Sequence, residues 1–231
     1  MTYQRLCVWS GPVFLGFFFI GMVVVAQLLP PPSAAASAQT IAAFYGARTG
    51  EIRAGLLIAL TSCAFYLPWV AIVSAHMKRI ENVSPALVII QALGGAVGTI
   101  AFMVPILIWL TASFRPERDP EITRTLNDLG WVIFTIGYPP FEAQLVSFAL
   151  AVIGDKAQKP VLPSWVGYLA LSTGVSFFPA VLITYLKTGP FSYTGFIGLW
   201  LPLIMFGAWL CALTILLLKA TREEEKSSAR P

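Results

Sequence analysis

Long apolar stretches alternate with short polar segments along the whole chain. A helix needs about 20 apolar residues to cross about 30 Å of hydrocarbon, and six stretches meet this requirement. They cover 8–29, 54–75, 86–110, 129–152, 164–186 and 196–218. The pattern predicts an all-α fold, a polytopic transmembrane bundle of six spans in a single domain over 1–231, with a polar cytoplasmic tail over 219–231.

The segment between the first two spans has a pattern of its own. Three consecutive prolines, 30–32, end the first span, because proline cannot continue a helix. Residues 34–53 then predict a short amphipathic helix at the membrane interface, with Phe44 and Tyr45 facing the lipid. We expect the first span to stay as an uncleaved anchor, with cleavage as a secretory signal as the alternative.

Composition supports a membrane protein. Hydrophobic residues make up 57% of the chain and charged residues 11%, whereas a soluble domain has about a quarter charged residues. We therefore expect the lipid bilayer to be the main partner, and we expect no nucleic acid to bind. Cys7, Cys63 and Cys211 are widely separated and His76 is the single histidine, so neither a metal site nor a cofactor is expected.

Basic residues indicate the orientation. Nine lie on the side of the N-terminus and six on the opposite side, although four of the nine belong to the tail. The nine are Arg5, Lys78, Arg79, Lys156, Lys159, Lys219, Arg222, Lys226 and Arg230. Because basic residues concentrate on the cytoplasmic side, both termini are predicted to be cytoplasmic.

Glu142 is the single Asp, Glu, Lys, Arg or His within the six predicted spans. It follows Asp128 by about 21 Å of helix, which places it near the middle of the membrane. A carboxyl group there is costly unless it is neutralised or hydrogen-bonded, so its presence is a functional hypothesis. With no Lys or Arg in the spans, we expect Glu142 to be protonated at neutral pH unless water reaches it.

Two prolines, Pro139 and Pro140, interrupt the fourth span just before Glu142. We predict two half-helices, with Glu142 in or beside the first turn of the second, where the helix dipole favours a carboxylate. Two interpretations stay open. Either Glu142 caps the broken helix, or it contributes to a ligand-binding or catalytic site together with Tyr138.

The outer end of the fourth span carries a second polar group of residues. Asp119, Pro120 and Glu121 form a helix-start pattern, so this helix is predicted to begin outside the membrane. The arginines and acids of 115–124 are expected to form surface ion pairs, with a ligand-binding lid as the alternative.

Asp128 lies further along the same helix, near Trp131. We expect Asp128 to pair with Arg48 or Arg53 at the membrane interface, with a catalytic or ligand-binding role as the alternative. Tryptophan is favoured where the apolar core of the membrane meets water. Four tryptophans near span ends are predicted to anchor the bundle there: Trp9, Trp109, Trp131 and Trp165.

Prolines and small residues describe how the spans pack. Each of spans two to six contains proline, and the backbone carbonyl that proline frees in lipid must find another donor, so we expect kinked helices around an enclosed space. These prolines are Pro68, Pro105, Pro139, Pro140, Pro179 and Pro202. Gly94 and Gly98 form a GxxxG motif that predicts an internal helix contact, with a homodimer or a membrane partner as the alternative.

Several short segments carry a resemblance to known proteins. They are IAAFY at 41–45, KRIE at 78–81, FRPERDPE at 114–121, LNDLGW at 126–131 and KTGPF at 187–191. With these segments the chain resembles a family of bacterial, largely actinobacterial, six-helix integral membrane proteins of unknown function, over most of its length. The resemblance implies the fold and the bacterial inner membrane, and it implies no activity.

Three functions are compatible with these features. The first is binding or transport of a hydrophobic small molecule or lipid in an intramembrane cavity. Its candidate ligand-binding residues are Glu142, Tyr138, Asp128 and Trp131. Another is an accessory subunit that packs against a membrane partner through Gly94 and Gly98.

The remaining function is a membrane-embedded enzyme of the isoprenoid isomerase or cyclase type, with Glu142 as general acid. Such an enzyme needs an acid in an aromatic pocket. The candidate pocket residues are Phe134, Tyr138, Phe177, Phe178 and Trp209.

Overall fold

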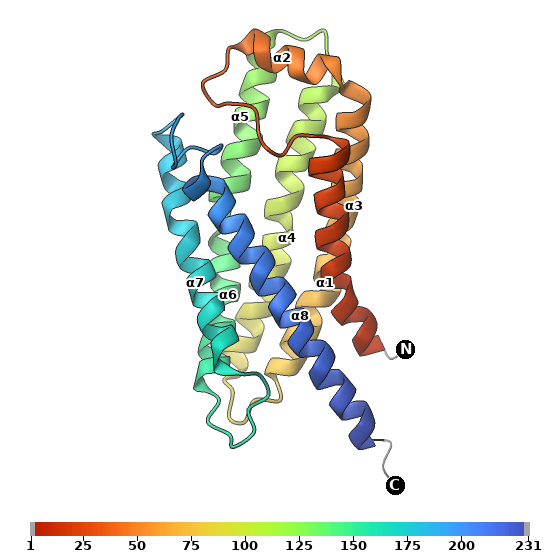
Figure 1. Cartoon of the computed structure of the whole chain (residues 1–231), viewed down its shortest axis with the longest axis vertical. Helices are drawn as coiled ribbons and strands as arrows, with labels where there is room; N and C mark the ends of the chain where they lie inside the picture. Colours follow the sequence, from red (N-terminus) through yellow and green to blue (C-terminus); the bar gives the residue numbers. More distant parts are fainter. Residues whose placement is uncertain (1–2, 229–231) are drawn as a thin grey trace.

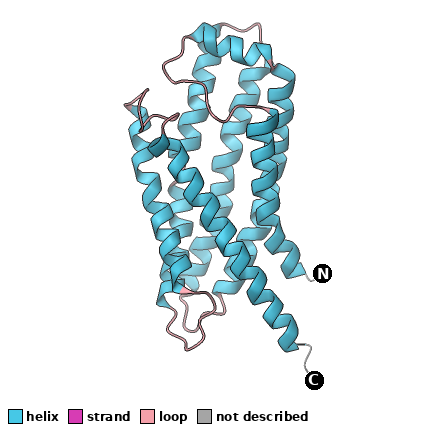
Figure 2. Cartoon of the chain, in the orientation of Figure 1, coloured by secondary structure: helices cyan, strands magenta, loops and turns pink. Residues whose placement is uncertain are grey.

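The computed structural model describes residues 3–228, with side chains up to residue 223. Helices account for most of the described chain, and no strand occurs in it (Figure 2). Six segments are long and apolar enough to cross a membrane: Tyr3–Val25, Thr49–Met77, Pro85–Phe114, Pro120–Gly154, Ser164–Thr184 and Phe196–Glu223. The prediction of an all-α chain with six candidate membrane spans is confirmed.

The first half of the chain forms three spans and one short helix. Helix α1 (Tyr3–Phe19) continues into a π-helical turn, η1 (Ile20–Val25). Helix α2 (Ala38–Ala47) lies across one end of the bundle (Figure 1). Helices α3 (Thr49–Met77) and α4 (Pro85–Phe114) then each form a span as one unbroken helix. The position of α2 at a membrane interface stays a prediction.

The fourth span is broken as the sequence predicts. Helix α5 (Pro120–Ile136) ends before the double proline, and α6 (Pro139–Gly154) begins at it. The start of α5 is also confirmed, because the Asp119 side chain accepts a hydrogen bond of 2.8 Å from the backbone N–H of Glu121.

Irregular helical turns interrupt the last two spans. Helix α7 (Ser164–Phe177) ends in a 3-10 helix, η2 (Phe178–Thr184). A π-helical turn, η3 (Phe196–Trp200), leads into α8 (Leu201–Ser228). These irregular turns and the break between α5 and α6 occur beside prolines, whereas Pro68 and Pro105 lie within the unbroken helices α3 and α4.

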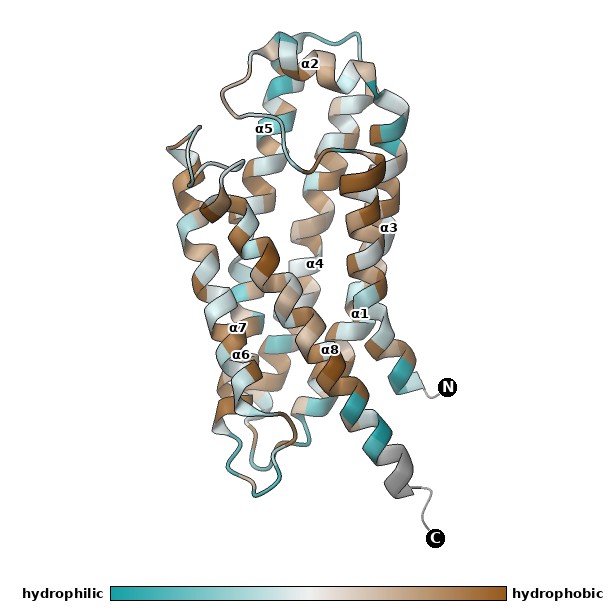
Figure 3. Cartoon of the chain, in the orientation of Figure 1, coloured by the Kyte–Doolittle hydropathy of each residue, from teal (hydrophilic) through white to brown (hydrophobic). Residues whose placement is uncertain are grey.

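The two ends of the bundle are polar. Hydrophobic positions follow the helices along their length, and hydrophilic positions gather at both ends (Figure 3). Helix α1 begins and α8 ends at the same end of the bundle (Figure 1). This arrangement is required of a chain with an even number of spans, and it agrees with the prediction that both termini lie on one side.

Glycines allow α4 and α6 to approach closely. A Cβ atom on Gly94 would lie 2.6 Å from the carbonyl oxygen of Pro140, and one on Gly98 would lie 2.5 Å from the ring of Phe141. Both glycines therefore serve an internal helix contact. Their role in a contact with a second copy or a membrane partner stays a prediction.

Two of the predicted tryptophan anchors are wrong. Trp109 and Trp131 are fully buried, and their ring centroids lie 4.5 Å apart between neighbouring helices. Trp9 and Trp165 are 45% and 51% exposed, which an anchor requires. The sequence places all four near span ends, but only packing decides which of them face inward.

The α4–α6 contact yields a stability prediction. Gly94→Ala places a methyl group against the backbone of α6, so we expect the free energy of unfolding to fall by about 1–3 kcal/mol. Gly207→Ala in α8 is the matched control, because a Cβ atom there meets nothing within 4 Å. Thermal unfolding in detergent measures both variants, and an equal loss in the two would contradict the close α4–α6 contact.

Candidate functional site

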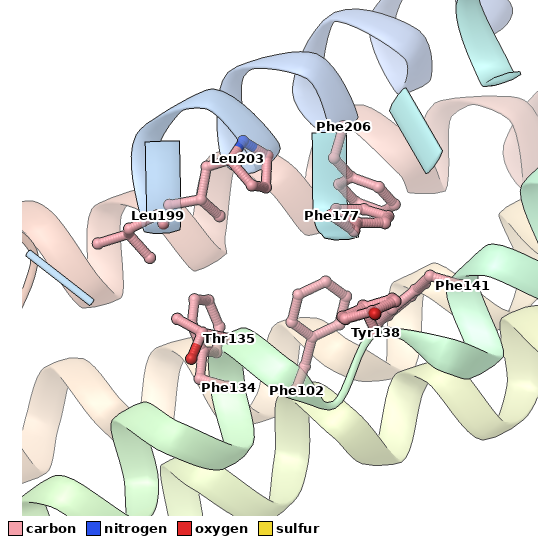
Figure 4. A pocket seen from close by; sticks show the side chains of 11 residues that line it. Phe102, Phe134, Thr135, Tyr138, Phe141, Phe177, Leu199, Leu203 and Phe206 are labelled. Atoms are coloured by element: carbon pink, nitrogen blue, oxygen red, sulfur yellow. The ribbon is translucent and has the colours of Figure 1, made fainter. Parts of the chain in front are cut away.

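A cavity of about 50 Å³ lies where the fourth span is broken (Figure 4). Helices α4 to α8 all contribute to its wall. The lining residues are Phe102, Phe134, Thr135, Tyr138, Phe141, Phe177, Gly198, Leu199, Pro202, Leu203 and Phe206. Figure 4 shows Leu203 and Phe206 of α8 facing Phe134 and Phe102 across the cavity.

Aromatic rings form most of the wall. The ring centroid of Phe102 lies 5.0 Å from that of Phe141 and 6.0 Å from that of Phe206. On the α7 side, Tyr138 stacks on Phe177 with centroids 5.7 Å apart. Each such pair contributes about 0.5–1.5 kcal/mol beyond its buried area, so the wall is held in place by its own contacts.

The lining agrees in part with the predicted aromatic pocket. Phe134, Tyr138 and Phe177 line the cavity, as expected. Phe178 does not line the cavity and instead packs against Tyr138, with ring centroids 6.0 Å apart. Trp209 does not line the cavity either and packs against Phe206, with ring centroids 6.0 Å apart.

Backbone hydrogen bonding changes at the break. The N–H of Gly137 donates to the carbonyl oxygen of Ile133 at 2.9 Å, and the N–H of Glu142 donates to Tyr138 at 3.0 Å. Between these two bonds lie Pro139 and Pro140, which have no N–H. The helix ladder is therefore interrupted beside the cavity and near the middle of the 35-residue span.

Glu142 does not line the cavity but lies at the contact between α6 and α7. A Cβ atom on Gly174 would lie 2.7 Å from its Oε1 atom and 2.9 Å from Oε2, so the carboxyl group packs on bare backbone of α7. Oε2 is buried and has no hydrogen-bond partner among the described residues. Glu142 lies in the first turn of α6, as predicted, but within the described residues no side chain makes a capping hydrogen bond at the start of this helix.

Asp128 belongs to a polar network outside the cavity. Its Oδ1 atom accepts hydrogen bonds from the Tyr193 hydroxyl at 3.1 Å and from Nδ2 of Asn127 at 3.2 Å. Oδ1 of Asn127 accepts from the Tyr45 hydroxyl at 3.2 Å. The network joins α2, α5 and the segment between η2 and η3.

This network corrects the position predicted for Tyr45. Its side chain is 1% exposed, so it does not face the lipid. Phe44, beside it, is half-buried. The hydroxyl of Tyr45 turns inward because Asn127, which is fully buried, offers it an acceptor.

The predicted ion pair of Asp128 with Arg48 or Arg53 is also wrong. Arg53 donates to the carbonyl oxygen of Ser113 at 2.6 Å, where α4 ends with unpaired carbonyls. Arg48 donates to the side chain of Gln27. In the predicted loop of ion pairs, Arg124 and Glu121 do pair, at 2.6 Å.

Trp131 connects the polar network to the cavity wall. Its ring stacks on Tyr193 with centroids 6.0 Å apart and meets Phe134 edge-on at 5.7 Å. The four residues predicted to bind a ligand therefore occupy three places. Tyr138 lines the cavity. Trp131 and Asp128 lie behind Phe134, on the side of the polar network. Glu142 lies at the α6–α7 contact.

Sequence reasoning missed several contributors to these sites, among them Phe102, Phe206 and Tyr193. Phe102 follows Gly98 by one helical turn, so the face that carries the GxxxG motif was a usable signal for it. Phe206 likewise follows Pro202 by one turn on α8. Tyr193 lies in a loop segment and had no comparable signal.

The described residues offer few groups to a metal or cofactor. No three His, Cys, Asp or Glu side chains among them lie together in a way that would hold a metal ion. Among the lining residues, Thr135 and Tyr138 alone carry polar side chains. The cavity is therefore suited to an apolar molecule with a small polar group.

Comparison with protein-family models, curated proteins and solved structures found no match to this chain. The resemblance to a bacterial membrane-protein family stays a prediction. The chemistry of the cavity therefore carries the functional interpretation.

The polar network predicts a pH dependence. Burial raises the pKa of Tyr45 above its ordinary value of 10.0, and burial with the nearby Asp128 does the same for Tyr193. Above about pH 10 the unfolded chain releases these protons while the folded chain keeps them, so stability falls as pH rises, by up to about 1.4 kcal/mol per pH unit for each tyrosine.

Unfolding between pH 8 and 11 tests this dependence. Tyr45→Phe is expected to be about 1 kcal/mol less stable at pH 8, because it loses the bond to Asn127, and to show a shallower alkaline fall. Tyr185→Phe is the control, since Tyr185 is 83% exposed. An alkaline fall of the same slope in wild type and Tyr45→Phe would contradict the assignment.

Glu142 yields a second stability prediction. Glu142→Met keeps the length of the side chain and removes the unpaired carboxyl oxygen, so we expect unfolding to become about 1–3 kcal/mol less favourable. Glu81→Met, at an exposed loop position, should change little. Thermal unfolding measures both. A marked loss of stability in Glu142→Met would favour the cap interpretation instead.

Proposed function

We propose that this chain is an integral protein of the bacterial inner membrane that binds or transports a hydrophobic small molecule or lipid. The cavity at the α5–α6 break is the observation that carries the proposal. Ligand sites are typically concave, mostly apolar and equipped with a few polar groups. The cavity has this composition, with five phenylalanines beside the two polar side chains of Thr135 and Tyr138.

The size of the cavity limits how the ligand binds. One water needs about 10–15 Å³ by the same kind of measure, so the cavity holds the equivalent of only a few waters. A lipid-sized molecule therefore places its head and first few carbons inside. The rest of its chain extends into the bilayer or between helices.

The orientation proposed here rests on charge. The end of the bundle where α1 begins and α8 ends also carries the loops after α3 and α6 (Figure 1). These loops contain Lys78, Arg79, Lys156 and Lys159. Basic residues favour the cytoplasmic side, which supports cytoplasmic termini.

Glu142 and Asp128 act indirectly in this proposal. A general acid must lie within hydrogen-bond reach of the group that it protonates, and neither residue lines the cavity. The enzyme alternative stays a prediction without a supporting contact. Glu142 is proposed to influence the ligand through the α6–α7 contact that positions Tyr138 and Phe177.

Native mass spectrometry of gently purified protein, with extraction of retained molecules, tests the proposal. Leu203→Phe fills the cavity, and Ile204→Phe adds the same volume at the next position, which is 55% exposed. We expect wild type and Ile204→Phe to retain a specific hydrophobic molecule and Leu203→Phe to lose most of it.

Two outcomes would contradict binding in the cavity. The first is equal retention by all three proteins. The second is recovery of bulk phospholipid alone from wild type, and co-purification of another protein at fixed stoichiometry would then favour the accessory-subunit alternative.

A further inference from the structure

We propose that the ligand of the cavity is an apolar alcohol, recognised through a hydroxyl group that donates a hydrogen bond to the broken backbone of α5. This inference rests on the proposed function and specifies the chemical class of the ligand. It follows from which polar atoms the cavity wall offers and which of them already have partners.

Two residues that line the cavity, Phe134 and Thr135, have backbone carbonyl groups that lack a donor within the described residues. In a continuous helix, the carbonyl of Thr135 would accept from the N–H of residue 139, but Pro139 has none. The carbonyl of Phe134 would accept from Tyr138, but that N–H makes no backbone bond, because α5 ends at Ile136. No other backbone N–H or side chain in the described part of the chain donates to either oxygen.

The place of these two residues in the span makes an unpaired carbonyl costly. Phe134 and Thr135 line the cavity near the middle of the span, and an unpaired carbonyl in hydrocarbon costs several kcal/mol. The Thr135 hydroxyl cannot supply the bond, because it donates to the carbonyl oxygen of Trp131 at 2.7 Å. A ligand that donates a hydrogen bond here would satisfy an acceptor that the fold leaves open.

Tyr138 supplies the complementary group. It lines the cavity, and its hydroxyl makes no hydrogen bond within the described residues. A phenol can donate to a ligand oxygen. A ligand hydroxyl can therefore accept from Tyr138 while it donates to a backbone carbonyl, whereas an ether or ketone oxygen can only accept.

The wall also argues against a charged head group. No acidic side chain of the described residues lines the cavity, and Glu142 packs on Gly174 instead. An ammonium group would be buried without a counter-ion, which is costly in a site surrounded by lipid. A neutral hydroxyl on an apolar chain fits both the polar atoms and the aromatic lining.

The test compares two isomers, 1-decanol and methyl nonyl ether. They have the same composition and nearly the same volume, but only the alcohol donates a hydrogen bond. The rise of the unfolding temperature with added compound gives an apparent Kd for each. We expect wild type to bind the alcohol about tenfold more tightly than the ether, since the ether leaves a buried acceptor unpaired.

Variants locate the origin of the preference. Pro139→Ala restores an N–H that can donate to the Thr135 carbonyl, so the preference for the alcohol should fall, but not to onefold, because the Phe134 carbonyl still lacks a donor. Pro68→Ala, in the unbroken α3, is the control and should keep it. Tyr138→Phe should weaken alcohol and ether by a similar factor and leave their ratio unchanged, because Tyr138 donates to either oxygen.

The outcomes separate this inference from the proposed function. Equal affinity of alcohol and ether, with both lost in Leu203→Phe and kept in Ile204→Phe, would overturn the hydroxyl inference and leave a cavity that binds apolar molecules. Stabilisation that does not respond to Leu203→Phe would overturn both. If Pro139→Ala does not fold, the wild-type comparison with these two cavity variants still decides the question.

Discussion

Two prolines that lack a backbone N–H, Pro139 and Pro140, determine the structure at the centre of this protein. In hydrocarbon every backbone carbonyl needs a donor from within the protein or from a ligand, and Pro139 and Pro140 remove two donors from the middle of a membrane span. The span consequently separates into α5 and α6. Neighbouring helices surround the break with aromatic side chains, and the cavity lies between them.

The surrounding contacts keep the break in place. Gly94 and Gly98 let α6 lie close to α4 on one side of the break, and on the other side the network of Tyr45, Asn127 and Tyr193 ties α5 to α2 and to the segment between η2 and η3. The irregular turns η2 and η3 lie at the level of the break. Phe177, which lines the cavity, immediately precedes η2, and Gly198 and Leu199, which also line it, belong to η3. Many membrane transporters also have a discontinuous helix near the middle of the membrane, where they place their binding site, a similarity of principle that carries no evolutionary relationship.

Local chemistry made part of this structure predictable. The six spans follow from length and hydropathy, and the break follows from a double proline that no continuous helix accommodates well. The start of α5 follows from Asp119 and Pro120 alone. Long-range packing made the rest unpredictable. Phe141 and Glu142 are neighbours in sequence, and only the arrangement of α4 and α7 places the first at the cavity and the second against Gly174. The bond between Tyr45 and Asn127 likewise joins residues 82 positions apart.

Photolabelling tests the central claim, that the α5–α6 break is a ligand site, most directly. Protein in native-like membranes is irradiated with a ten-carbon alcohol that carries a diazirine near its hydroxyl group, and the labelled peptides are mapped. Labels concentrated on 134–141 and 198–206, and competed by unlabelled 1-decanol, are the predicted result. Labels spread over the exposed faces of all six spans, without competition, would contradict a ligand site at the break.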